Sequence, residues 1–466
     1  MSASPLTVPP VMTAGPVLHE PCVLLKLGEV VLKGRNRQRF ERLLHENIRR
    51  SVKDLGVGIR VWQREGVIVL RTSPGSVVSP DSPGSSDTTG SASGPDTTGS
   101  PDRTCSADST FSTTLSNSAA STTTRAPGGP GRLTADAAAD LVAERMRLVM
   151  GLARVCRAVR VAKDTDAAAA AAIELMAGRT GSFAVRARRR DKRFPVTSAQ
   201  IAVDLGERIR RAHGLTVNLS NPGTTVHVEV DQREIFVYTD GLPGQGGLPV
   251  GMSGRALVLV SGGIDSPVAA YRMMRRGLRC GYLHFSGMPL TGPESVYKAY
   301  GLVRQLDRFQ GGSRLFVVAF GNAQRRLASS GAGRLQIMAQ RRLMLKTGEA
   351  LARRLGAAAL ITGDSLGQVS SQTLTNLTAL DDAVSLPILR PLIGLDKLEI
   401  IAEARAIATL GISELRDEDC CSLLAPRQAE TRARIADLRR IEARMEADDL
   451  AEELATAAQE HTPAWS

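Results

Sequence analysis

The spacing of apolar residues in the first third of the chain predicts a small α+β domain. Short apolar runs and helical stretches follow one another in the order β-α-β-β-α-β, which is the ferredoxin-like pattern. We therefore assign residues 21–162 to a ferredoxin-like domain. Its predicted strands are Cys22–Leu27, Ile59–Gln63, Val67–Arg71 and Val155–Val161, and its helices run from Asn36 to about Leu55 and over Ala135–Met150.

A second group of short elements occupies residues 163–246 and predicts another α+β domain. Helical spacing of apolar residues predicts helices, and short apolar or alternating runs predict strands. The helices are Asp166–Met176 and Thr197–His213, and the strands are Phe183–Arg188, Val217–Leu219, Thr225–Val230 and Glu234–Tyr238. A Gly- and Pro-rich segment, Gly241–Gly254, then leads into the rest of the chain.

Strands and helices alternate regularly from residue 247 to residue 425. This alternation predicts a doubly wound parallel sheet, whose ligands bind beyond the carboxyl ends of the strands. The fold class is thus an α/β domain preceded by two α+β domains. The expected strands are Ala256–Val260, Gly281–Phe285, Leu315–Ala319 and Ala358–Thr362, with helices near Glu294–Arg308 and Gln336–Leu355.

Three segments fall outside these domains. We expect residues 1–20 to be a disordered leader and residues 426–466, which are charged and amphipathic, to be a peripheral helical tail. Residues 73–132 are rich in Ser, Thr, Gly, Pro and Asp, so they cannot bury enough apolar surface to offset their ordering entropy. We expect a disordered insert there, whose deletion leaves activity nearly unchanged.

The charge of the chain favours a polyanionic partner. Lys and Arg number 59 against 47 Asp and Glu, which gives a net charge of +12. A basic run within residues 186–193 is the first candidate to bind RNA phosphates, and Lys33 and Arg35 form a second candidate group. The alternative is that the basic run is only a solvated edge of the protein. Aromatic residues are only 3%, which argues against recognition by base stacking. The basic run contains Arg186, Arg188, Arg189, Arg190, Lys192 and Arg193.

Cysteine usage and hydropathy exclude other classes of protein. The six cysteines are scattered without a CxxC pair, which argues against a disulfide framework and against a zinc or iron–sulfur site. No apolar stretch is long enough to span a bilayer, and the N-terminus lacks a secretory pattern. We expect a cytoplasmic protein with no membrane contact and no metal site of its own.

Ser261–Ser266, with the sequence SGGIDS, is the strongest candidate for chemistry. It follows the predicted strand Ala256–Val260 and precedes a helix that Asp265 or Ser266 can cap, with Pro267 in the first turn. Free backbone amides at such a junction favour a phosphate. No Lys-Ser/Thr pair follows the glycines, so this is not the GxxxxGK[ST] loop. An ordinary glycine turn is the alternative.

Other candidates follow the later strands. His284 and Phe285 end the second strand of the α/β domain, although a lone histidine there is more often structural. Ile361–Gln372 is rich in Gly and hydroxyl residues, which suits close approach to a nucleotide. Arg341 and Arg342 either bind phosphate or are ordinary surface residues. Cys420 and Cys421 follow three acidic residues that raise thiol pKa values, so spacing alone favours an inert pair.

The SGGIDS loop resembles the pyrophosphate loop (PP-loop) of ATP pyrophosphatases. Read as a whole, the chain is similar to the bacterial tRNA 4-thiouridine synthases, the tRNA uracil 4-sulfurtransferases. Four blocks carry the resemblance and cover most of the chain outside the leader, insert and tail. They are LGEVVLKGRNRQRF; RARRRDKRFPVTSAQI with NPGTTVHVEV; GGLPVGMSGRALVLVSGGIDSPVA; and TGDSLGQVSSQTL through RPLIGLDKLEII to DEDCC.

The resemblance implies the domain names and the reaction. Residues 163–246 would be a THUMP domain, whose profile could begin near residue 136, and residues 247–425 an ATP-binding PP-loop domain. ATP activates O4 of uridine 8 of tRNA by adenylation, with Mg²⁺ neutralising the pyrophosphate, and a persulfide on Cys421 supplies sulfur. Asp265 would position Mg–ATP or act in catalysis. The implied ATP contacts are Leu259, Val260, Ser261, Gly262, Gly263, Asp265, Ser266, His284, Phe285, Arg341, Gly363 and Gln372.

The resemblance also leaves questions open. Some relatives carry a C-terminal rhodanese domain with a second cysteine, and no cysteine follows Cys421 here. A cysteine desulfurase or another carrier would then load Cys421, and sulfur transfer to the thiamine sulfur-carrier protein is in doubt. A homodimer is left open. Two alternatives are an adenylating tRNA ligase with a non-sulfur nucleophile, for which Cys421 is dispensable, and a non-catalytic RNA-binding protein with a degenerate nucleotide fold.

Overall fold

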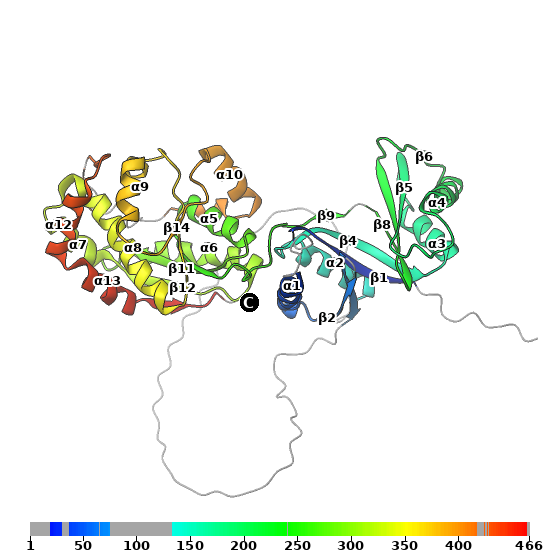
Figure 1. Cartoon of the computed structure of the whole chain (residues 1–466), viewed down its shortest axis with the longest axis horizontal. Helices are drawn as coiled ribbons and strands as arrows, with labels where there is room; N and C mark the ends of the chain where they lie inside the picture. Colours follow the sequence, from blue (N-terminus) through cyan, green and yellow to red (C-terminus); the bar gives the residue numbers. More distant parts are fainter. Residues whose placement is uncertain are drawn as a thin grey trace, which may run out of the picture.

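The computed structural model describes residues 19–29, 37–64, 66–74, 133–239, 241–416, 424, 426 and 428–463. Three bodies lie in a row along the molecule, with the nucleotide-type α/β domain at one end (Figure 1). Residues 1–18 of the predicted leader, nearly all of the 73–132 insert, Lys33, Arg35 and the Cys420–Cys421 pair lie outside the described residues. His19 and Glu20, which we assigned to the leader, instead begin the first strand.

The ferredoxin-like fold is confirmed, with strand order β2-β3-β1-β4 and two helices against the sheet. Helix α1 buries Phe40, Leu44 and Ile48, which are spaced four residues apart and so share one face. The Thr134 hydroxyl accepts a hydrogen bond from the Ala137 amide and caps α2. The elements are β1 His19–Leu27, α1 Arg37–Ser51, β2 Val57–Arg64, β3 Val67–Pro74, α2 Ala135–Met146 and β4 Leu152–Ala162, with a 3₁₀ turn at Lys53–Leu55.

The second domain continues the same sheet, which the sequence did not predict. Strand β4 pairs on one side with β1 and on the other with β8, so both domains belong to one nine-stranded sheet. A core of Ala, Val, Ile and Phe residues lies beneath α3 and α4. The elements are α3 Thr165–Leu175, β5 Ser182–Arg189, α4 Ser198–His213, β6 Thr216–Val217, β7 Thr224–Val230, β8 Glu234–Tyr238 and β9 Leu242–Pro243.

The α/β domain is a six-stranded sheet in the order β14-β13-β10-β11-β12-β15. All pairs except β12–β15 are parallel, as predicted for a doubly wound fold. Helices α5, α6 and α10 contribute to the core on one face, and α7, α8, α12 and α13 to the core on the other. The strands are β10 Arg255–Leu259, β11 Arg279–Ser286, β12 Leu315–Ala319, β13 Leu360–Ile361, β14 Ile388–Leu389 and β15 Gln459–His461.

The helices of this domain are α5 Asp265–Arg275, α6 Glu294–Gln310, α7 Gly321–Ser329, α8 Gln336–Arg354, α9 Leu374–Asp381, α10 Lys397–Ala406, α11 Leu410–Ser413, α12 Ile435–Met445 and α13 Ala447–Thr456. None of the helices in the described part of the chain has the length and hydropathy of a membrane span.

The end of the chain differs from the predicted peripheral tail. Helices α12 and α13, separated at Glu446 (φ 51°), pack against α8, and β15 adds an antiparallel edge to β12 (Figure 1). Leu438 and Ile441 are buried in the domain core, and Glu442 receives two hydrogen bonds from the buried Arg342. Most other charged positions of this segment face solvent, and its apolar stripe completes the α/β domain.

Candidate functional site

The SGGIDS loop connects the end of β10 to the start of α5, at the carboxyl edge of the parallel sheet. Internal hydrogen bonds fix its shape: the Ser261 amide donates to the Ser266 hydroxyl (3.0 Å), and the Gly263 amide donates to Ser261 Oγ (3.2 Å). Pro267 lies in the first turn of α5, as predicted, because it needs no amide partner there. The loop is therefore preformed.

Asp265 does not cap the helix, contrary to one of our predictions, and neither does Ser266. The residue before α5 is Ile264, and no side chain accepts a hydrogen bond from the first turn. The Asp265 carboxylate is held instead by Lys397 Nζ (2.6 Å) and by the Gln368 amide (2.9 Å). The backbone amides at the start of α5 thus keep the positive end of the helix available to an anion.

The segment that follows strand β13 places a second group of polar side chains next to the loop. Gly363 passes so close that a Cβ atom there would lie 2.7 Å from the Ser266 amide nitrogen, so only glycine fits. Asp364 follows and is 3% exposed. Its carboxylate accepts hydrogen bonds from Arg341 (2.5 Å), Thr362 (2.8 Å) and, at 3.3–3.4 Å, from Gln372 and Arg390.

These partners set the ionisation of Asp364. Burial alone would raise the pKa of its carboxyl, but Arg341, Thr362 and Arg390 hold that pKa below its ordinary value. Asp364 is therefore an anion at neutral pH that orients two guanidinium groups beside the loop.

Several buried polar atoms around this cluster have no hydrogen-bond partner. They are Gln368 Oε1, Gln372 Oε1 and Arg390 Nη2. Gln368 is bonded to Asp265, and the other two side chains are bonded to Asp364, so the three belong to one region. Unpaired buried polar atoms are costly, and their concentration here indicates a site that a polar ligand completes.

His284 and Phe285 lie at the carboxyl end of β11, next to β10, but their side chains are engaged internally. The His284 ring contacts the Val260 carbonyl (3.0 Å) and the Ser295 hydroxyl (3.3 Å), and Phe285 packs edge-on against Phe320. Val260 is buried and Leu259 half-buried at the end of β10. These four positions thus offer backbone rather than side-chain groups to a ligand.

The basic run of the second domain divides into two kinds of residue. Arg186, Arg188, Lys192 and Arg193 are exposed at the end of β5 and in the following turn. Arg189 donates to the Phe194 and Val196 carbonyls, and Arg190 makes an ion pair with Glu229. The exposed four remain candidates for RNA phosphates, while the other two shape the turn.

The described cysteines are unsuited to nucleophilic chemistry. Cys22, Cys156 and Cys280 are all buried, and none of these three forms a disulfide. Burial raises the pKa of the Cys22 and Cys280 thiols to about 12, so both stay protonated at neutral pH. The described residues contain no group of three or more His, Cys, Asp or Glu side chains suited to a metal ion.

Sequence reasoning missed Lys397, Gln368, Asp364 and Arg390 as individual site residues. Lys397 and Gln368 lie 132 and 103 positions from Asp265, so no local spacing links them. Their presence in the blocks TGDSLGQVSSQTL and RPLIGLDKLEII was the only signal.

The fold and the site together define an enzyme with a PP-loop nucleotide domain joined to RNA-binding domains. Family models agree: the ferredoxin-like domain of ThiI matches residues 22–78, the THUMP domain residues 164–240, and "Thiamine biosynthesis protein (ThiI)" residues 251–447. A probable tRNA sulfurtransferase of Nocardia farcinica is 47% identical over 440 residues, covering 93% of this chain and 92% of the relative. The chain belongs to the tRNA sulfurtransferase family, as the sequence blocks indicated.

Other relatives and solved structures agree with this assignment. A probable tRNA sulfurtransferase of Thermus thermophilus is 44% identical over 307 residues, which are 66% of this chain and 76% of the relative. The crystal structure of a 4-thiouridine synthetase–RNA complex with bound ATP has a TM-score of 0.75 and 26% identity, covering 95% of this chain and 99% of the other. PH1313 from Pyrococcus horikoshii shares the fold, with a TM-score of 0.56 at 19% identity over 83% of this chain and 99% of its own.

Proposed function

We propose that this protein forms 4-thiouridine at position 8 of tRNA, by ATP-dependent adenylation of the uridine followed by sulfur transfer from a cysteine persulfide. The observation that carries the proposal is the preformed SGGIDS loop, with an uncapped helix start and a Lys397–Asp265 pair, on a chain that also has a THUMP domain. The similar 4-thiouridine synthetase binds both RNA and ATP.

The residues around the loop fit ATP. Free amides at the start of α5 suit its phosphates, and the unpaired Gln372, Gln368 and Arg390 atoms suit a ligand with many acceptors and donors. We assign ATP contacts to Leu259 through Gly263, Asp265, Ser266, His284, Phe285, Arg341, Gly363 and Gln372. Lys397 joins this set as a cation that can follow the charge of the leaving pyrophosphate.

A magnesium ion fits the same place through Asp265. Mg²⁺ is usually held by one or two carboxylates together with substrate phosphates and waters, so a dedicated protein cage is not needed. Asp265 is the carboxylate of the loop itself, and its ion pair with Lys397 would open when the metal ion binds. When bound, the ion would neutralise the pyrophosphate as it leaves.

In the proposed reaction, the loop amides and Lys397 hold ATP while uridine O4 attacks the α-phosphorus and pyrophosphate leaves. The terminal sulfur of the Cys421 persulfide then attacks C4, the C4–O4 bond breaks, and AMP departs with O4. A disulfide between Cys421 and the uridine sulfur remains, and a thiol reductant cleaves it to 4-thiouridine and free Cys421. A persulfide suits this role because it ionises more readily than a thiol.

Contacts on either side of residues 417–423 support a role for Cys421 at this loop. Before that segment, the Ser413 hydroxyl donates to the Gly263 carbonyl (3.3 Å) of the SGGIDS loop. After it, the Leu424 carbonyl accepts a hydrogen bond from Gln336 (2.7 Å) at the start of α8. Cys421 belongs to the stretch between these two contacts, so the chain is tied to the α/β domain on both sides of that stretch.

The test is reconstitution with unmodified tRNA, Mg–ATP, cysteine, a cysteine desulfurase and a thiol reductant. The native chain should form 4-thiouridine, and Cys421→Ala should abolish it while tRNA-dependent release of pyrophosphate persists. Cys105→Ala is the matched control and should retain thiolation. Thiolation by Cys421→Ala would remove Cys421 from the mechanism. Loss of pyrophosphate release in an SGGIDS variant, with intact thiolation, would reject adenylation at this loop.

The remaining partners follow from this chemistry. A cysteine desulfurase is the proposed persulfide donor, and a tRNA substrate implies a cytoplasmic location. Transfer of sulfur to a thiamine sulfur-carrier protein is a second role that the family name suggests. A homodimer would be tested by the molar mass in solution. The alternative, a ligase that adds a non-sulfur nucleophile, predicts modified tRNA without sulfur in the reconstitution.

A further inference from the structure

Tyr297, in the first turn of α6, carries the only exposed Phe, Tyr or Trp ring among the described residues. Its side chain is 70% exposed, whereas the other aromatic side chains in the described ranges are buried or half-buried. An exposed ring contributes little to the stability of the fold. What Tyr297 can do therefore depends on the groups that lie beside it.

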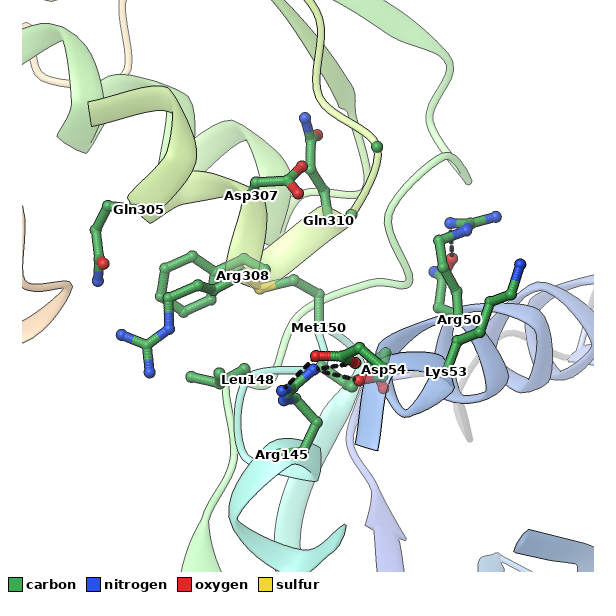
Figure 2. Close-up of a pocket in the computed structure, with 16 residues that line it drawn as sticks. Arg50, Lys53, Asp54, Arg145, Leu148, Met150, Gln305, Asp307, Arg308 and Gln310 are labelled. Atoms are coloured by element: carbon green, nitrogen blue, oxygen red, sulfur yellow. Dashed lines mark hydrogen bonds and ion pairs between the residues drawn. The ribbon is translucent and has the colours of Figure 1, made fainter. Parts of the chain in front are cut away.

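Helix α6 runs from the SGGIDS loop to the ferredoxin-like domain. Its last turn lies near α1 and forms part of the wall of a cavity of about 700 Å³, together with the ends of α1 and α2 (Figure 2). Near its start, the Ser295 hydroxyl contacts the His284 ring (3.3 Å), which also contacts the Val260 carbonyl (3.0 Å). The first turn of α6, with Tyr297, is thus held beside the end of β10, where the loop begins.

Helix α11 packs on the side of α6 that carries Tyr297. Gly301 lies one turn further along α6 on the same face, and a Cβ added there would be 3.4 Å from Ile412 Cγ2. The Lys298 ammonium donates to the Leu415 carbonyl (2.6 Å), just beyond the end of α11. Side chains of a helix lean toward its N-terminus, so the Tyr297 ring extends past α11 toward Leu415.

The same α11 region contacts the SGGIDS loop. The Ser413 hydroxyl donates to a carbonyl of that loop (3.3 Å), and Leu415 is 59% exposed. Tyr297 and Leu415 thus place an aromatic ring and an aliphatic side chain in solvent next to the loop. The residues on either side of Leu415, Glu414 and Arg416, are exposed and carry opposite charges. Because these charges offset each other, this surface suits an uncharged flat group better than a phosphate.

We propose that Tyr297 and Leu415 form a nucleobase subsite, in which the target uridine stacks on the Tyr297 ring with its O4 toward the SGGIDS loop. Enzymes that modify a base take it out of the helical stack and hold it against aromatic or apolar side chains. The proposal rests on the proposed function, which supplies the uridine, and adds the groups that hold it. One ring for one base also agrees with a low aromatic content, since phosphate contacts elsewhere can hold the rest of the RNA.

The first test is single-turnover release of pyrophosphate by the full chain, with saturating ATP and unmodified tRNA. Tyr297→Ala should lower the rate about tenfold to hundredfold, the loss typical of one base–aromatic stack. The dissociation constant for tRNA should stay within about twofold of the native value, because phosphate contacts supply most of the affinity. Tyr297→Phe keeps the ring and should retain the native rate. Val203→Ala, which truncates a similarly exposed side chain of α4, is the control and should also retain it.

The second test locates the base. A tRNA that carries 4-thiouridine at position 8 crosslinks under near-ultraviolet light to groups in contact with that base. Peptide mapping of the native chain should find the crosslink at the start of α6 or at Leu415. The yield at the start of α6 should fall in Tyr297→Ala and persist in Tyr297→Phe.

Several results would overturn the subsite. They are a native rate in Tyr297→Ala, equal losses in Tyr297→Ala and Tyr297→Phe, and crosslinks confined to other parts of the chain. Weaker tRNA affinity with a native rate at saturation would assign Tyr297 to general RNA binding instead. Normal pyrophosphate release with slower loading of Cys421 by the desulfurase would assign the surface to a protein partner.

Failure of the proposed function gives a different result. In that case the native chain itself would release no pyrophosphate with tRNA, and the subsite would fall with the reaction. When the native chain is active, the comparison of Tyr297→Ala with Tyr297→Phe tests the subsite alone. Melting temperatures equal to the native one exclude loss of fold as the cause.

Discussion

Asp265 and Lys397 form an ion pair at the SGGIDS loop, the proposed phosphate site. Lys397 is the first residue of α10, and its side chain is 42% exposed, so it contributes little to packing. Under the proposed function the pair would exchange partners when ATP and a cation bind, with Asp265 facing the cation and Lys397 facing the phosphates. Each of the two residues would then have a separate role in the proposed reaction.

We expect Lys397→Gln to lower the rate of tRNA-dependent pyrophosphate release by about a hundredfold, the loss typical of one preorganised electrostatic contact. The measurement is single-turnover release with saturating ATP and tRNA. Arg405→Gln, in the last turn of the same helix and exposed, is the control and should keep the native rate. A native rate in Lys397→Gln would show that the ion pair serves only the ATP-free state.

Asp364 yields a different prediction, because it acts through Arg341 and Arg390. Replacing it by Asn keeps the volume but removes the charge that orients both guanidiniums. We expect the KM for ATP to rise about tenfold, with a smaller change in kcat, since one charge-assisted contact is worth about 1.5–3 kcal/mol. Partial recovery of KM in Asp364→Glu would separate positioning from loss of fold. Equal falls in kcat and kcat/KM would contradict the proposed role of Asp364 in positioning the two arginines.

Sequence alone located the loop but could not supply its partners. The residues SGGIDS stand together, and their glycines and apolar flank predict the strand–loop–helix unit directly. Lys397, Gln368 and Asp364 reach the loop only because β13 and α10 lie beside β10 and α5 in the sheet. Such proximity is a property of strand order, which periodicity does not encode. Capping by Asp265 was wrong for the same reason, since a distant lysine competes for the carboxylate.

At the scale of elements, Arg342 connects the C-terminal helices to the α/β domain. Its side chain is 1% exposed and lies between Glu442 of α12 and Asp382 after α9. Arg342 Nη1 also donates to the Ala379 carbonyl. Removal of the cation therefore leaves Glu442 and Asp382 without their shared buried partner, and only the more peripheral Lys346 and Arg439 remain beside them.

We expect Arg342→Met to destabilise the protein by about 3–5 kcal/mol, the cost typical of an orphaned buried charge. Urea denaturation, followed by near-ultraviolet circular dichroism, measures it. Arg353→Met, at an exposed position of the same helix, should change stability by less than about 1 kcal/mol. A mild effect in Arg342→Met would mean that α12 and α13 are held by their apolar face alone.

The C-terminal segment also shows where helical periodicity is insufficient. The charged, amphipathic pattern correctly predicted helix, but it could not reveal that the apolar stripe packs on α8 or that β15 adds to the sheet edge. A stripe that narrow fits either a surface helix or a core-covering one. The break between α12 and α13 at Glu446 could not be predicted from composition either, because Glu446 is a non-glycine residue with positive φ.

At the scale of the whole molecule, Glu229 links the ferredoxin-like and THUMP domains. Lys26 of β1, Arg190 after β5 and Tyr238 of β8 all contact its carboxylate. Burial would raise the pKa of Glu229, yet Lys26 and the other donors lower it to about 2. Because the folded pKa lies below the ordinary value of 4.5, the native state gains stability above pH 4.5 and loses it as pH falls toward about 2.

We expect this carboxylate to contribute on the order of 3 kcal/mol near neutral pH. Urea denaturation at pH 6, 4 and 3 should show a steep fall in stability for the native chain and a shallower one for Glu229→Gln. Glu144→Gln, which alters an exposed carboxylate of α2, should follow the native slope. Parallel curves for the native chain and Glu229→Gln would assign the acid sensitivity elsewhere.

The continuous sheet has a mechanical consequence for the handling of RNA. Because β4 is hydrogen-bonded to both β1 and β8, the ferredoxin-like and THUMP domains form one continuous unit. The stretch Gly241–Gly254 connects this unit to the α/β domain, and the ion pair between Arg276 and Glu29 (2.9 Å) also holds the two together. Under the proposed function, an RNA bound at the exposed arginines of the THUMP domain would reach the SGGIDS loop at a set length, so stems one base pair longer or shorter would present the wrong nucleotide.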